Sequence, residues 1–175
     1  MGRICSSAGN LLQEFLAVQE KESAIPSPPS EQRWCPPTTD VCKVNFDAAV
    51  FRSSNSAGLG VVVRDSSGAV IGALSVPISL GSSVAELEAL ACLRAVQFAS
   101  EIGLTRVVFE ADSAAVINAL RQGLSELTCY ENMLDDIRVL VSAFQYCDFN
   151  LVKRLCNLVA DAIAKKANSV VGSQV

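Results

Sequence analysis

The sequence contains no histidine among its 175 residues. Histidine is the base of Ser-His-Asp triads, the partner of the nucleophile in Cys-His pairs and a frequent zinc ligand. Its absence therefore excludes a triad, a Cys-His pair and any zinc site that needs histidine. Catalysis by carboxylates remains open, because Asp and Glu together supply 18 side chains.

Positive charge is also scarce, since 14 Lys and Arg face 18 Asp and Glu and leave a net charge of −4. Proteins that bind nucleic acid through bulk charge carry an excess of Lys and Arg, because phosphate contacts supply most of the affinity. The composition argues against that binding mode. A polyanionic ligand would have to meet local basic groups or metal ions.

Long apolar runs are missing as well. No segment approaches the about 20 apolar residues that span a membrane, and the first residues lack the apolar core of a secretory signal. The seven cysteines are scattered and form no CxxC pair. Such cysteines are typical of reduced thiols in an intracellular protein, so we expect a nuclear or cytosolic location.

The chain is predicted to consist of an extension and one domain. Five of the six prolines lie within residues 23–40, which indicates an extended linker. We therefore expect an N-terminal extension with a Pro-rich linker over residues 1–40, a domain over 41–170 and a short tail over 171–175. This length suits one globular core.

The first six residues fit the M-G-x-x-x-[ST] pattern for N-myristoylation. Gly2 would carry the myristate and Cys5 a second lipid. A single acyl chain binds membranes only marginally, so this anchor stays an alternative. Without acylation of Gly2 we expect no membrane association, and we expect a monomer.

Within the domain, hydrophobic periodicity predicts a mixed α/β sheet flanked by helices. Gly and Pro mark the turns, and the first three strands should form an antiparallel meander. The expected strands cover residues 43–50, 58–64, 69–80, 106–110 and 147–152. The expected helices cover residues 84–102, 113–121, 130–144 and 157–167, with Asn157 as the cap of the last one.

Acidic residues stand at several junctions of these elements, and most have a structural explanation. Asp112 follows a strand and is a favoured helix N-cap residue. Glu86 completes a capping box with Ser83. Asp161 could pair with Lys165 one helical turn later. These explanations stay open as alternatives to a shared function.

Asp47 is harder to explain structurally, because it interrupts a β-run where Asp is disfavoured and no turn follows at once. One metal site would account for this residue and the other acids together. Oxygen ligands without His or Cys suit Mg²⁺ or Mn²⁺, and two such ions are a standard device for phosphodiester cleavage. The candidate ligands are Asp47, Glu86, Asp112 and Asp161.

The order of these motifs resembles the type 1 ribonuclease H family, and more narrowly the reverse-transcriptase-like ribonuclease H domains of plants, which are often derived from retroelements. The resemblance covers about residues 34–167. The matching pieces are Trp34–Pro37, Lys43–Ala49, Gly58–Asp65, Ala85–Leu90, Glu110–Ser113 and Asn157–Ala164.

The resemblance implies a five-stranded sheet, with three antiparallel strands and two parallel ones. It also implies metal-dependent cleavage of the RNA strand of RNA–DNA hybrids by two Mg²⁺ or Mn²⁺ ions. Asp47 would bridge both ions, Glu86 and Asp112 would complete the cage, and Asp161 would hold the ion that activates water. Glu88 is expected to point away from this cluster, because it lies two residues along the helix from Glu86.

Three features depart from the family pattern. Leu151 stands where a histidine is usual, Ala48 replaces a glycine, and residues 122–132 contain no Lys or Arg. Slow turnover and weak hybrid binding are therefore expected, and a non-catalytic module that binds nucleic acid or protein stays the alternative. The candidate phosphate contacts are Arg121, Lys153, Arg154, Lys165 and Lys166.

Overall fold

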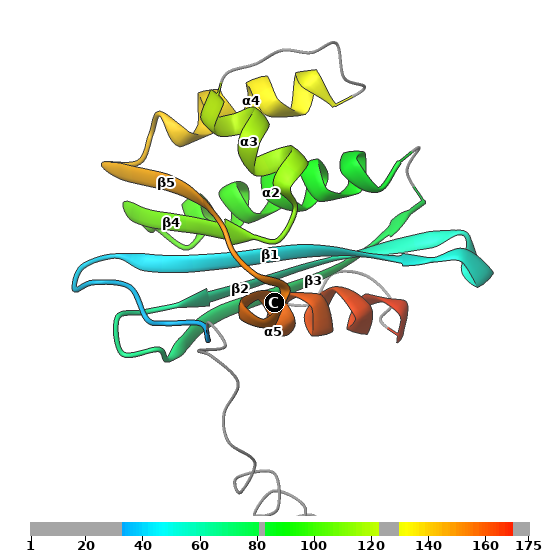
Figure 1. Ribbon diagram of the computed structural model, residues 1–175, viewed down its shortest axis with the longest axis horizontal. Coiled ribbons are helices and arrows are strands. Elements are labelled where there is room, and N and C mark those ends of the chain that lie inside the picture. Colours follow the sequence, from blue (N-terminus) through cyan, green and yellow to red (C-terminus); the bar gives the residue numbers. More distant parts are fainter. Residues whose placement is uncertain (1–32, 81–82, 123–129, 170–175) are drawn as a thin grey trace, which may run out of the picture. The chain divides into compact units, whose positions relative to one another are not determined.

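A computed structural model of the protein describes residues 33–80, 83–122 and 130–169. Five strands form one sheet in the order β3-β2-β1-β4-β5 (Figure 1). The first three are antiparallel, and β4 and β5 are parallel to β1. This confirms the predicted mixed sheet. The strands are β1 (Cys42–Phe51), β2 (Ser56–Arg64), β3 (Val70–Ser79), β4 (Arg106–Ala111) and β5 (Tyr146–Leu151).

The helices cover both faces of the sheet. In Figure 1, α2, α3 and α4 lie on one side and α5 lies on the other. Short 3-10 turns follow β1 and α5, over residues 52–54 and 167–169. The α-helices are α2 (Val84–Glu101), α3 (Ala114–Gln122), α4 (Glu131–Val141) and α5 (Arg154–Lys166).

The bounds of these elements agree with the predicted ones to within a few residues, except at the start of α5. This helix begins at Arg154 after Lys153 as its N-cap. The prediction that Asn157 caps the helix is therefore wrong. Asn157 lies inside α5 and is only 1% exposed, and its amide serves other partners described below.

The apolar core lies between the sheet and α2, α3 and α4. Val44 and Phe46 of β1 and Phe109 of β4 are fully buried there. Phe109 stacks on Phe149 of β5 with ring centroids 5.2 Å apart. This core fixes the middle of β1 and the end of β4, next to which two of the candidate acids lie.

The opposite face of the sheet packs against α5 through residues without bulky side chains. A Cβ atom added at Gly60 would lie 2.3 Å from the carbonyl oxygen of Ala160 and from the amide nitrogen of Ala164. The Ser75 hydroxyl on β3 also donates to the Ile163 carbonyl at 3.0 Å. Glycine on β2 thus lets the helix backbone lie directly against the strand.

Strand β1 alternates polar and apolar residues but is buried on both faces. Asn45 is 1% exposed and Asp47 is 3% exposed, although both face away from the core that holds Val44 and Phe46. The reason is that α5 covers this second face. A carboxylate and an amide are therefore buried beneath a helix.

The segment before β1 is anchored by cation–π contacts. The guanidinium carbon of Arg64 lies 4.3 Å from the centroid of the Trp34 ring, and Lys43 Nζ lies 5.6 Å from it. Pro77 lies in β3, which is an edge strand, where a residue without an amide hydrogen is tolerated. In the described part of the chain, no helix is long and apolar enough to cross a membrane.

Several predictions fall on residues outside the described ranges. They concern the lipidation of Gly2 and Cys5, most of the extension over residues 1–40, and the tail over 171–175. These stay predictions.

Candidate metal centre

Asp47 and Asp112 lie just beyond the stretch in which the parallel strands β1 and β4 pair, with Asp47 in the middle of β1. Asn45 of β1 pairs with Glu110 of β4, so two residues further on the register brings Asp47 beside Asp112. Oδ1 of Asp47 accepts the Ala48 amide at 2.9 Å. Burial, and then repulsion from Asp112, raises the pKa of Asp47 to about 6.

Glu88 on α2 also belongs to this cluster. It is 9% exposed and hydrogen-bonds to Asp47. Burial, followed by repulsion from Asp47 and Asp112, raises the pKa of Glu88 to about 8. Burial and mutual repulsion thus favour a shared proton between Asp47 and Glu88 in the metal-free site.

This position of Glu88 differs from our expectation. We predicted that Glu88 points away from the other acids and that Glu86 joins them. In the structure Glu86 is half-buried, and its amide donates to the hydroxyl of Ser83, the N-cap of α2, at 3.1 Å. The capping explanation holds for the Glu86 backbone, and the geometry brings Glu88 to Asp47.

A signal for Glu88 was present in the sequence. The residues three, four, seven and eleven positions after Glu88 are small or apolar, and all are fully buried: Ala91, Cys92, Ala95 and Ala99. Residues at these spacings share one face of a helix. Glu88 therefore continues the buried stripe of α2, whereas the stripe that starts at Glu86 includes the polar Gln97.

Asp112 lies just after β4 and meets groups from α5. Its Oδ1 accepts from Asn157 Nδ2 at 3.4 Å, and its Oδ2 lies 3.5 Å from Arg154 Nη1. Among the described residues, these are the hydrogen bonds that its carboxylate accepts. Asp112 thus faces the acid cluster, and the first-turn amides of α3 do not bond to it, contrary to the N-cap alternative.

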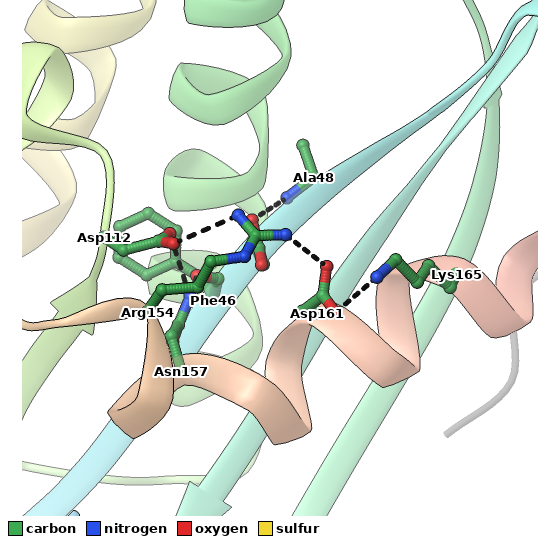
Figure 2. A network of polar contacts seen from close by, with 8 residues as sticks. Phe46, Ala48, Asp112, Arg154, Asn157, Asp161 and Lys165 are labelled. Atoms are coloured by element: carbon green, nitrogen blue, oxygen red, sulfur yellow. Dashed lines mark hydrogen bonds and ion pairs between the residues drawn. The ribbon is translucent and has the colours of Figure 1, made fainter. Parts of the chain in front are cut away.

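Asp161 lies on α5, two turns after Arg154. Its Oδ1 is 3.3 Å from Arg154 Nη2, and its Oδ2 is 2.6 Å from Lys165 Nζ (Figure 2). The predicted pair with Lys165 is therefore present. Repulsion from Asp161 also contributes to the raised pKa of Asp47, so the pairing does not remove Asp161 from the cluster.

Asn157 connects the strands to α5, a role that we missed in the sequence. Its Nδ2 donates to the Phe46 carbonyl at 2.9 Å as well as to Asp112, and its Oδ1 accepts from Asn45 Nδ2 at 3.3 Å. Asn45 also donates to Glu110, which pairs with Lys43 at 2.8 Å. This buried polar chain holds α5 and Asp112 in place.

The donor set of this cluster fits a hard divalent cation such as Mg²⁺. It contains carboxylate oxygens only. Oε2 of Glu88 is buried and has no hydrogen-bond partner among the described residues, so this atom is available to a ligand. In the described ranges, no three acids already surround one point closely enough to hold an ion, and Arg154 lies between Asp112 and Asp161.

The predicted phosphate contacts are spread over the surface. Arg121 on α3 bonds to Asn150 Oδ1 at 2.9 Å and lies 3.8 Å from an Asp148 oxygen. Lys153 is the N-cap of α5, and Arg154 and Lys165 contact the acids. Of these groups, the structure brings Arg154 and Lys165 to the cluster and leaves Arg121 with partners on β5.

Leu151, which stands in place of the usual histidine, ends β5 and is 46% exposed. It cannot exchange protons. Asp135 and Asp136 lie outside the acid cluster as exposed residues on α4, and Asp135 pairs with Arg138 at 2.6 Å.

The strand order, the helices on both faces and the fit to solved structures define a ribonuclease H-like fold. RNase H1 from the halophilic archaeon Halobacterium salinarum NRC-1 matches with a TM-score of 0.68 at 22% identity, over 74% of this chain and 98% of that chain. The N-terminal RNase H domain of a Mycobacterium tuberculosis protein matches with a TM-score of 0.66 at 19% identity, over 74% of this chain and 94% of that chain.

The sequence assigns the chain to a family within this fold. The Reverse transcriptase-like family matches residues 45–167, and the chain belongs to it. LC11-RNase H1, whose structure was solved in complex with an RNA/DNA hybrid, matches with a TM-score of 0.63 at 20% identity, over 72% of this chain and 95% of that chain. A search of curated proteins found no match.

Proposed function

We propose that this protein is a metal-dependent endonuclease that cleaves the RNA strand of RNA–DNA hybrids. The observation that carries the proposal is the convergence of acids from four separate elements: Asp47, Glu88, Asp112 and Asp161. The proposal keeps the two-ion mechanism that we predicted and assigns to Glu88 the place that we had given to Glu86.

The side chains have distinct parts in this proposal. Asp47 lies at the centre and would contact both ions. Glu88, with its raised pKa, would release its proton when an ion binds and use the unpartnered Oε2 as a ligand. Asn157 keeps Asp112 in place, and Asp161 would complete the set from α5. When bound, Mg²⁺ or Mn²⁺ supplies the acidified water and the positive charge that stabilises the departing oxygen.

The hybrid is the favoured substrate because of the family and because a structure of the same fold binds one. LC11-RNase H1 was solved with an RNA/DNA hybrid. The net charge of −4 means that affinity must come from the metal ions and a few basic groups. We therefore expect weak binding whose dependence on salt is shallow, because few phosphates are neutralised by basic side chains.

The test is cleavage of a labelled RNA–DNA hybrid by the full chain with Mg²⁺ or Mn²⁺. We expect products with a 5′-phosphate and a 3′-hydroxyl, and loss of cleavage in Asp112→Asn and in Glu88→Gln. The matched variant Glu86→Gln should retain cleavage. Loss in Glu86→Gln with full activity in Glu88→Gln would return the ligand role to Glu86, and full activity in Asp112→Asn would refute the site.

A non-catalytic interaction module is the second candidate, favoured by the surface around the site. Leu151, Leu155 and Leu158 are 46%, 52% and 48% exposed, and Leu151 stands where the family pattern usually has a histidine. Hybrid binding without cleavage under both metals would support this candidate. Plant or retroelement origin, nuclear or cytosolic location and the monomeric state stay predictions.

A further inference from the structure

Arg154 brings a positive charge to the middle of the acid cluster. It is the first residue of α5, and its side chain is 66% exposed. The guanidinium extends between Asp112 at the end of β4 and Asp161 on α5 (Figure 2). Its two terminal nitrogens lie 3.5 Å and 3.3 Å from oxygens of these carboxylates.

The charge of Arg154 also reaches the two buried acids. It lowers the pKa of Asp47 and the pKa of Glu88, against the stronger effects of burial and repulsion. Lys165, in contrast, contacts only the outer oxygen of Asp161. Within the described residues, Arg154 is therefore the cation that offsets the repulsion of the whole cluster.

The contacts of Arg154 are loose. Charge-assisted hydrogen bonds between guanidinium and carboxylate are usually about 2.7–2.9 Å long, and both distances here are longer. The Arg154 side chain is 66% exposed, so its release from the acids requires no rearrangement of packed residues. A divalent ion that needs the facing oxygens of Asp112 and Asp161 could thus replace it at little cost.

We propose that Arg154 is an exchangeable counter-ion of this site: its guanidinium and divalent cations compete for the carboxylates of Asp112 and Asp161, and the displaced guanidinium then binds a phosphate of the nucleic-acid substrate. The inference rests on the proposed function and deepens it. Guanidinium pairs with phosphate in the same two-pronged geometry as with carboxylate. One side chain would thus stabilise the metal-free site and position the substrate in the loaded one.

The first test measures metal binding, not activity. The full chain is titrated with Mn²⁺ by calorimetry and by electron paramagnetic resonance, as the wild type, Arg154→Ala and Arg154→Lys. We expect about tenfold tighter Mn²⁺ binding in Arg154→Ala, which corresponds to about 1.4 kcal/mol. The Mn²⁺ affinity of Arg154→Lys should lie between those of the wild type and Arg154→Ala. Lysine keeps the positive charge but lacks the two terminal nitrogens with which the guanidinium contacts both carboxylates.

The control is Arg52→Ala, which removes the same charge from an exposed position five residues beyond Asp47 along the chain. Its Mn²⁺ affinity should equal that of the wild type. Equal or weaker Mn²⁺ binding by Arg154→Ala, with normal circular dichroism, would overturn the inference. An equal gain in Mn²⁺ affinity in Arg52→Ala would also overturn the inference, because it would show that any loss of positive charge has this effect.

The second test separates this inference from the proposed function. At saturating Mn²⁺, Arg154→Ala should raise the KM for the hybrid about tenfold with a smaller change in kcat. An unchanged KM would overturn the phosphate contact. If neither the wild type nor any variant cleaves a hybrid, the nuclease proposal fails. If Arg154→Ala nevertheless binds Mn²⁺ more tightly than the wild type, the competition between Arg154 and the metal for the carboxylates still stands.

Discussion

The raised pKa of Glu88 makes a quantitative prediction for the variant Glu88→Gln in metal-free protein. In the folded state the pKa of Glu88 is about 8, against an ordinary value of 4.5. The folded protein therefore binds this proton more tightly than the unfolded chain does. Linkage requires that the wild type loses stability as the pH rises from about 4.5 to about 8.

Glutamine has no proton to lose and closely matches the shape of the protonated glutamate. The two proteins should be about equally stable near pH 4.5, and the variant should gain up to about 1.4 kcal/mol per pH unit above it. The gain should level off above pH 8. The total gain in the free energy of unfolding should be about 2–5 kcal/mol. Each kcal/mol corresponds to a rise of about 3 °C in melting temperature.

The measurement is urea unfolding of both proteins in EDTA at intervals from pH 4.5 to pH 9. Glu101→Gln is the matched control on the same helix. Hydrogen bonding to Arg94 lowers the pKa of Glu101, so this carboxylate is already ionised throughout most of the range. The effect of Glu101→Gln should thus not change between pH 6 and pH 9.

Addition of Mg²⁺ should reduce the pH dependence of the wild type, because the ion favours ionised Glu88. A stability difference between Glu88→Gln and the wild type that does not vary with pH would refute the reasoning. It would mean that Glu88 is ionised in the folded protein at all these pH values, and that its carboxylate does not face the other acids.

Three further variants test the surroundings of the cluster in metal-free protein. Asp112→Asn should raise the melting temperature at pH 8, because its charge repels two buried acids; a lower value would favour a helix-capping role. Asn157→Leu should lose about 2–4 kcal/mol in urea unfolding, because it leaves buried polar groups unpaired. Gly60→Ala should cost about 2 kcal/mol or more, because its Cβ would meet the backbone of α5. Gly72→Ala, whose Cβ would meet a phenylalanine ring at 3.3 Å, should cost less, and equal losses would argue against close packing of α5.

The sheet and its helices could be predicted from the sequence because their signals are local. Apolar periodicity, glycine turns and the Ser83 cap each act within a few residues. The start of α5 was missed because Asn157 has two uses, as a cap residue or as a buried amide. Only the tertiary structure, with Phe46 and Asp112 within reach of the Asn157 amide, decides between them.

The position of Glu88 shows where an argument from residue types was incomplete. Glu86 and Glu88 are both glutamates near the start of one helix, and the capping box drew attention to Glu86. The burial of Glu88 follows from the phase of the buried stripe, in which Ala91, Cys92 and Ala95 follow Glu88 at helical spacings. A carboxylate that continues a buried stripe must meet other buried groups, so the phase of the stripe predicts that Glu88 is buried.

The distance between Asp47 and Asp161 is determined by residues without functional groups. Gly58 and Gly60 on β2 leave room for the backbone of α5 at Ala160 and Ala164, where a Cβ would come within 2.2–2.3 Å. A bulkier residue at either glycine would push α5 away and carry Asp161 with it. The acids alone could therefore suggest a site, but small residues on a neighbouring strand determine how closely α5, and Asp161 with it, approaches the sheet.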